Sequence, residues 1–180
     1  MASRNESVPN SMLLEYQKLM RHHQDSFIHD MPKVEMHVHI EGTMTPELRW
    51  ELAARHGETI LNPKTDRPCQ DLAELQGLYK LLQDLHKSGV DGGMAQFFEL
   101  YYAGFTVLKD EQDFYRLAMN YYKRAADMNV RYCEPFFDPQ GHTTRGIPFV
   151  VMMAGLRRAQ IEAETKLNVS RSQNYLVHTL

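Results

Sequence analysis

The sequence predicts an α/β fold in which parallel strands alternate with helices. Two segments, residues 34–41 and 130–137, have the composition of strands, and each is followed by a turn or loop and then by apolar residues at helical spacing. Repetition of strand, loop and helix favours a parallel sheet over a sandwich or a bundle of helices. A length of 180 residues, with 43% hydrophobic and 24% charged residues, suits one globular domain.

The first 26 residues predict a polar segment followed by a helix over residues 12–26, with Ser11 as its cap. The opening stretch, Met-Ala-Ser-Arg-Asn-Glu-Ser, lacks the apolar region of a secretory signal, so we expect a cytoplasmic protein that is also compatible with the nucleus. The net charge of -3 and the short apolar runs argue against nucleic-acid and membrane partners. Cys69 and Cys133 are expected to be reduced thiols.

Residues 34–41 alternate between an apolar and a polar face, and the polar face carries His37, His39 and Glu41 beside Glu35. Gly42 ends this strand. Thr45-Pro46-Glu47 then predicts a capped helix start, and Gly57 its end. The same reasoning predicts the remaining elements: a surface excursion over 58–72, helices over 73–85, 97–108 and 111–128, the strand over 130–137, a loop over 138–146, a helix from Pro148, and the start of a third strand over 174–180.

The pair His37 and His39 has the spacing that a metal site on a strand requires. Residues i and i+2 on one strand face lie about 6.6 Å apart, so two imidazoles can reach one ion at about 2.0–2.1 Å. The pair also falls at the carboxyl end of its strand, where α/β barrels place their sites. On the residues alone, an ordinary strand with two hydrogen-bonded histidines explains the pattern equally well.

Other chemistries lack their motifs. The zinc deaminases that edit nucleic acids need His-x-Glu followed by Pro-Cys-x-x-Cys, whereas this chain has a single cysteine in Arg-Pro-Cys-Gln-Asp. A glycine-rich phosphate loop and a Gly-x-Ser-x-Gly turn are also missing from the sequence. Nucleoside triphosphate chemistry and serine hydrolysis are therefore disfavoured.

The stretch Met-Pro-Lys-Val-Glu-Met-His-Val-His-Ile-Glu-Gly-Thr-Met-Thr-Pro-Glu-Leu closely resembles the opening of the adenosine/adenine deaminase family, within the metal-dependent hydrolase superfamily. Three further matching stretches follow in family order, beginning at Phe97, Asp113 and Gly146, and the resemblance covers residues 27–172. Glu rather than Asp at Glu41, with Phe-Phe-Asp-Pro-Gln-Gly-His-Thr-Thr-Arg-Gly from Phe136, looks like the adenine deaminase and adenosine-deaminase-like branch.

The resemblance implies zinc-dependent hydrolytic deamination of a small-molecule 6-aminopurine, most simply adenine to hypoxanthine and ammonia. It makes His37 and His39 two ligands of one catalytic Zn2+ and places Glu41 near the purine pocket. Phe98 and Tyr102 are candidate pocket walls, although an aromatic stripe at helical spacing is more often core. Residues 138–145 follow a strand end, but turn and capping roles explain them equally well, and we assign them no catalytic role.

The resemblance also implies the N-terminal part of a (β/α)8 TIM barrel, which takes about 250 residues when complete. The catalytic acid, base and remaining metal ligands of the family come from later strands, so we expect an incomplete barrel that is inactive alone. Two alternatives stay open: an adenosine deaminase, and a non-catalytic fragment that binds a partner. The predicted parts are residues 1–26, the deaminase portion over 27–172, and a divergent tail over 173–180; the oligomeric state is not predicted.

Overall fold

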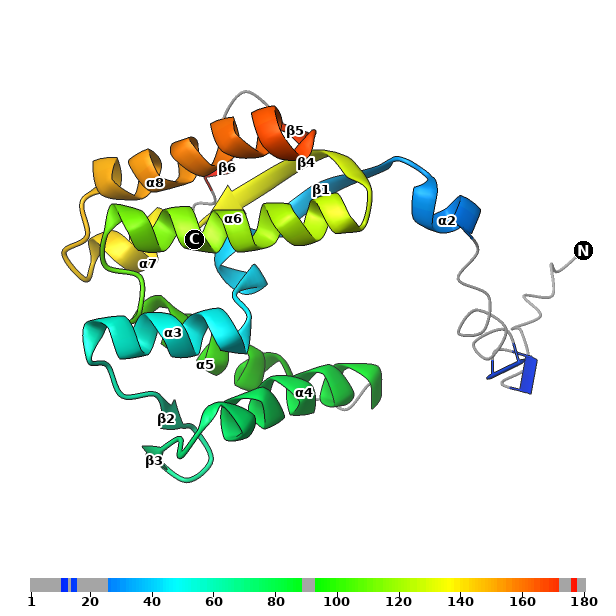
Figure 1. Ribbon diagram of the computed structural model, residues 1–180. Helices are drawn as coiled ribbons and strands as arrows, with labels where there is room; N and C mark the ends of the chain where they lie inside the picture. Colours follow the sequence, from blue (N-terminus) through cyan, green and yellow to red (C-terminus); the bar gives the residue numbers. More distant parts are fainter. Residues whose placement is uncertain (1–10, 13, 16–25, 89–92, 172–175, 178–180) are drawn as a thin grey trace, which may run out of the picture.

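The structure is a computed structural model that describes residues 11–12, 14–15, 26–88, 93–171 and 176–177 (Figure 1). Most of the helix predicted over 12–26, the glycine-containing break at 89–92 and most of the tail over 173–180 lie outside these residues. Within the described part of the chain, no helix is both long and apolar enough to cross a membrane.

The central sheet is parallel, as predicted. Strand β1 (Lys33–His39) pairs with β4 (Val130–Phe137), and β4 pairs on its other side with β5 (Ser170–Arg171) and β6 (Leu176–Val177). The two short strands lie against the beginning and the end of β4, so the predicted third strand is confirmed at residues 176–177. In the described sheet β1 is an edge strand, and the strands form an open arc.

Two long helices pack side by side next to this sheet (Figure 1). Helix α6 (Glu111–Asp127) begins with a capping box between Asp110 and Asp113, and α8 (Phe149–Glu162) continues into a π-helical turn over Ala163–Leu167. The predicted stripe of α6 is buried at Phe114, Leu117, Ala118, Tyr121 and Ala125. Met128, also expected in the stripe, is 52% exposed because the helix ends before it and Asn129 takes a left-handed backbone (φ 59°).

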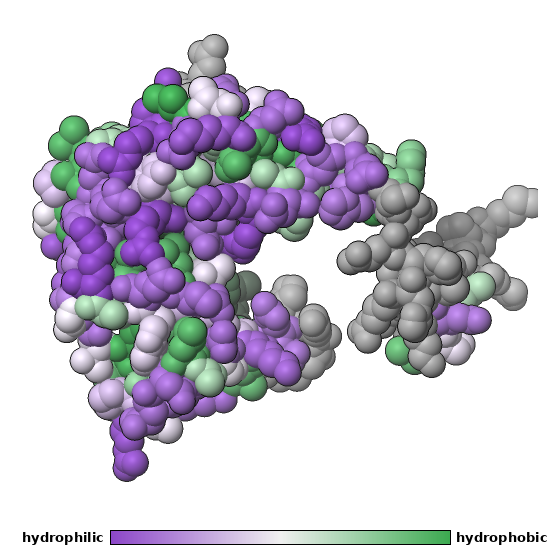
Figure 2. Space-filling model, in the orientation of Figure 1, coloured by the Kyte–Doolittle hydropathy of each residue, from purple (hydrophilic) through white to green (hydrophobic). Residues whose placement is uncertain are grey.

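A second group of helices follows the first strand. Helix α3 (Pro46–His56) starts at the predicted cap, where Thr45 accepts a hydrogen bond from the Leu48 N–H, and ends at Gly57 with φ 64°. It packs against α4 (Leu72–Ser88), which in turn packs against α5 (Gly93–Phe105). The predicted surface excursion contains a short antiparallel hairpin, β2 (Leu61–Asn62) and β3 (Arg67–Pro68). The face shown in Figure 2 is largely hydrophilic.

Three local predictions need correction or completion. A helical turn, α2 (Ser26–Asp30), precedes β1, and the predicted loop after β4 contains the short helix α7 (Pro139–Thr143). The strand over 34–41 ends at His39, because residues Ile40–Thr43 form the 3-10 turn η1. Cys69 and Cys133 are buried free thiols, as expected, and burial raises the pKa of Cys133 to about 11.

The alternation predicted for β1 fails in its first half. The pairing register with β4 shifts between Glu35 and Val38, which marks a bulge, and bulges re-aim side chains. Glu35 consequently reaches the helix layer, where the Tyr121 hydroxyl donates to its carboxylate at 2.7 Å. Val34 and Met36 are about 60% exposed rather than buried on one apolar face.

Candidate metal and substrate site

His37 and His39 lie together at the carboxyl end of β1, as the sequence predicted. Their ring centroids are 5.6 Å apart, and both rings stack on Phe136 of the neighbouring strand, at 4.4 and 5.8 Å. His37 occupies the bulge with φ 139°, a backbone conformation that residues other than glycine rarely adopt. Surrounding structure must hold such a conformation in place, and conformations of this kind are concentrated at functional sites.

Asp138, the residue after β4, connects the histidine pair to helix α5. Its Oδ1 lies 3.2 Å from His39 Nδ1, and its Oδ2 accepts a 2.6 Å hydrogen bond from the Tyr101 hydroxyl. The Asp138 side chain is 3% exposed, so these contacts are shielded from water. Burial, followed by the nearby charge of Glu41, raises the pKa of Tyr101 well above its usual range, which keeps the phenol a donor.

Glu41 lies in the η1 turn rather than on the strand, and it is 4% exposed. Its Oε1 accepts the Asp138 backbone N–H at 2.9 Å and lies 3.1 Å from His142 Nε2. Arg145 can only donate, and its Nη2 lies 3.0 Å from His142 Nδ1. His142 therefore accepts at Nδ1 and donates from Nε2 to Glu41.

The other carboxylate oxygen of Glu41, Oε2, is buried and has no hydrogen-bond partner among the residues that the structure describes. A buried acceptor left without a donor typically costs about 1–3 kcal/mol. The His142 ring that supports Glu41 is itself fully buried and stacked on Phe105 at 4.5 Å, so the carboxylate is held firmly. A ligand that offers an N–H or O–H group would satisfy Oε2.

Phe98 and Tyr102, the predicted pocket walls, lie on α5 and are 43% and 42% exposed. Their rings stack on each other at 5.9 Å, and their role in binding stays a prediction. The α5 residue that reaches the histidine pair is Tyr101, through Asp138. Sequence reasoning did not separate Tyr101 from its aromatic neighbours, because helical spacing alone does not show which ring meets a distant carboxylate.

Asp138 and His142 were also missed as site residues. The one signal for Asp138 was its position directly after a strand, and turn formation explained that position equally well. His142 had the same weak signal, because residues 138–145 follow a strand end. Its contact with Glu41, 101 residues away in the sequence, depends on the short helix α7 and could not be predicted.

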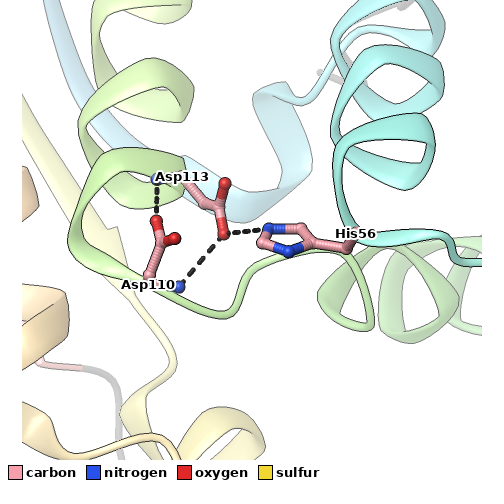
Figure 3. Close-up of side chains that lie close together, drawn as sticks. All are labelled: His56, Asp110 and Asp113. Atoms are coloured by element: carbon pink, nitrogen blue, oxygen red, sulfur yellow. Dashed lines mark hydrogen bonds and ion pairs between the residues drawn. The ribbon is translucent and has the colours of Figure 1, made fainter.

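A second group of metal-binding residue types lies at the start of α6: His56, Asp110 and Asp113 (Figure 3). Asp113 is fully buried and accepts four hydrogen bonds, from Arg55 Nη1 at 2.5 Å, His56 Nε2 at 2.7 Å, and the backbone N–H groups of Lys109 and Asp110 at 2.9 and 3.0 Å. Arg55 also binds Asp110 at 2.8 Å. Because both carboxylates are already paired with the Arg55 guanidinium, we interpret this cluster as structural.

The histidine pair, by contrast, fits a zinc ion. Imidazole nitrogens are preferred zinc ligands, and the two rings lie side by side at the carboxyl end of a parallel strand. The arrangement can hold a cation next to the buried acceptor Glu41 Oε2.

The fold places the chain among amidohydrolases with a TIM-barrel architecture, of which the described strands form an open part. It is similar to the crystal structure of adenine deaminase from Arthrobacter aurescens, with 37% identity and a TM-score of 0.63, covering 78% of this chain and 38% of that one. It is also similar to an amidohydrolase from Burkholderia ambifaria with bound Zn, with 25% identity and a TM-score of 0.60, covering 81% of this chain and 35% of that one.

Residues 32–178 match the family model described as adenosine deaminase. The adenine deaminase of Ectopseudomonas mendocina is 39% identical over 144 residues, which are 80% of this chain and 40% of that protein. The chain belongs to the adenosine deaminase family, as the resemblance predicted. It spans about 40% of the length of this relative.

Proposed function

We propose that this chain contributes the first metal-binding strand of a zinc-dependent deaminase that hydrolyses adenine to hypoxanthine and ammonia. The observation that carries the proposal is the convergence of His37 and His39 at the carboxyl end of β1, beside the buried carboxylates of Glu41 and Asp138. The adenine deaminases to which the chain is similar support the choice of reaction.

In this proposal His37 and His39 hold zinc, which when bound supplies Lewis-acid activation of water near neutral pH. The chain's other residues bind and orient the purine. Glu41 Oε2 is the acceptor for an N–H of the base, and its second oxygen is held by the Asp138 N–H and His142. A free purine base carries an imidazole N–H that a nucleoside lacks, and we assign this donor to Glu41 Oε2 because the relatives to which the chain is similar are adenine deaminases. Phe98 and Tyr102 remain the proposed aromatic wall.

The 180-residue chain alone is expected to bind zinc weakly and to release no ammonia from adenine. Catalytic zinc sites use three protein ligands plus a water, and the proposal assigns two in this chain. The measurement is zinc affinity by competition with a chromogenic chelator, together with an ammonia assay. His37→Ala and His39→Ala should each abolish the weak binding, whereas His29→Ala, an exposed histidine outside the site, should leave it unchanged.

A chimera tests the substrate. Residues 32–171 would replace the matching segment of the Arthrobacter aurescens adenine deaminase, and the folded chimera should release ammonia from adenine at least about tenfold faster, by kcat/KM, than from adenosine; tenfold corresponds to about 1.4 kcal/mol. A folded, zinc-loaded chimera that prefers adenosine would overturn the assignment of adenine. A folded chimera that fails to bind zinc would overturn the metal assignment.

A further inference from the structure

The neighbouring groups determine which residue donates the hydrogen bond between His39 and Asp138. Tyr101 donates to Asp138 Oδ2, and a carboxylate has only acceptor sites to offer at its other oxygen. The hydrogen bond at 3.2 Å between Asp138 Oδ1 and His39 Nδ1 therefore needs its proton on the imidazole nitrogen. A neutral His39 with Nδ1 protonated carries its lone pair on Nε2.

We propose that Asp138 is a positioning residue that holds His39 in the tautomer with Nδ1 protonated, so that Nε2 presents its lone pair to the metal. The inference deepens the proposed function, because it rests on His39 being a zinc ligand. Histidine ligands commonly donate their second ring N–H to a carboxylate, which fixes the tautomer and the ring orientation. Nothing in the spacing of His37 and His39 indicates which ring nitrogen faces the ion.

Asp138 is well placed for this role because three elements fix it. The strand β4 ends directly before it, its backbone N–H donates to Glu41, and the Tyr101 hydroxyl anchors the oxygen that His39 does not use. The Tyr101 ring packs closely over η1, since a Cβ atom added at Gly42 would meet it at 3.4 Å. The carboxylate is 3% exposed, so water competes little for the His39 N–H.

The test is the substitution Asp138→Asn in the 180-residue chain, because asparagine keeps the shape of the aspartate side chain. Tyr101 would still donate to the amide oxygen, so the amide NH2 would face His39 and require an acceptor at Nδ1. The variant should therefore convert His39 to the tautomer with Nε2 protonated. Long-range 1H–15N correlation spectra of the metal-free chain distinguish the two tautomers by the 15N shifts of the ring, and a purely structural role would not exchange these shifts.

The second readout is zinc affinity, which should fall about 10- to 100-fold in Asp138→Asn, the range typical for loss of an outer hydrogen bond to a metal ligand. Asp127→Asn, at an exposed position on α6, removes the same charge and should change neither readout. Tyr101→Phe should keep the His39 tautomer, because Asp138 Oδ1 still accepts from Nδ1.

Two results would overturn the inference: a wild-type His39 protonated at Nε2, or an Asp138→Asn variant that is folded and keeps the wild-type ring shifts. Exchanged ring shifts with unchanged zinc affinity would also overturn it, because the tautomer would then not serve the metal. If the wild-type chain binds no zinc while the ring shifts exchange as expected, the proposed function fails instead, and the hydrogen-bond direction stands.

Discussion

Two clusters in this molecule each combine a histidine with a buried carboxylate. They differ in the groups that complete them. At the start of α6, His56 and Asp113 are completed by Arg55, and both oxygens of the buried carboxylate accept hydrogen bonds. At the carboxyl end of β1, His39 and Asp138 are completed by a tyrosine, and one buried oxygen of the adjacent Glu41 has no partner in the described part of the chain.

The difference shows that the residue types alone do not define a metal site. The cluster at α6 has one histidine and two aspartates within reach of one another, but both carboxylates are already paired with Arg55. In the cluster at β1, the carboxylates of Asp138 and Glu41 accept from a tyrosine, histidines and a backbone N–H. An incompletely satisfied buried site is the one expected to take a ligand.

The largest expected effect is on stability, at the α6 cluster. Asp113→Ala would leave Arg55, His56 and two backbone N–H groups without their acceptor. Arg55 is 37% exposed and keeps Asp110, so the cost comes mainly from the other donors that lose their buried acceptor. One buried hydrogen-bonding group left unsatisfied typically costs about 1–3 kcal/mol, and we expect at least that loss in the free energy of unfolding measured with urea. Zinc affinity of the folded chain should not change.

The matched control is Glu51→Ala, which removes an exposed ion pair with Arg116. Exposed pairs contribute about 0–1 kcal/mol, so this variant should stay close to the wild type. If Asp113→Ala lost no more stability than Glu51→Ala, the α6 cluster would not be structural, and the contrast between the two clusters would fail.

At the β1 cluster, Glu41→Gln should not lower the free energy of unfolding as Asp113→Ala does. The amide oxygen can still accept from the Asp138 N–H and His142, while the buried charge on the unpartnered side is removed. We expect the free energy of unfolding to stay within about 1 kcal/mol of the wild type or to rise, as is common where a site is held ready for a ligand. Urea denaturation checks this, and a loss as large as that of Asp113→Ala would show that Glu41 is structural.

The fold was largely predictable because its signals are local. The cap at Thr45, the helix end at Gly57 and the strand Val130–Phe137 follow from short-range chemistry, and the structure confirms them. The histidine pair was predictable for the same reason. The bulge that changes the orientation of His37 was not predictable. It arises from the pairing of β1 with β4, a strand about a hundred residues away in the sequence.

The supporting residues of the site depend on long-range contacts and could not be predicted. Tyr101 meets Asp138 across 37 residues, and His142 meets Glu41 across 101. Each of these side chains had an ordinary local explanation as helix core, turn residue or loop polar group. The sequence therefore predicts the residues that could bind a metal, and only the fold identifies the residues that orient them.

The smallest expected effect is a pH dependence at the α6 cluster. The hydrogen bond from Arg55 holds the pKa of Asp110 below its ordinary value, and backbone hydrogen bonds at the helix start act in the same direction. Because the folded pKa lies below the unfolded one, the stabilisation is present above the unfolded pKa of about 3.9 and is lost as the pH falls through the folded value. Asp110→Asn isolates the charge, since asparagine caps a helix about as well as aspartate.

The measurement is the difference in melting temperature between the wild type and Asp110→Asn from pH 7 to pH 3. The wild type should be modestly more stable at pH 7, and the difference should shrink below about pH 4. It should also shrink in high salt, because the Asp110 side chain is 44% exposed and its pair with Arg55 is screened. A difference that stayed constant across this pH range would mean that Asp110 acts through its shape as a cap and that Asp113 alone carries the electrostatic part of the cluster.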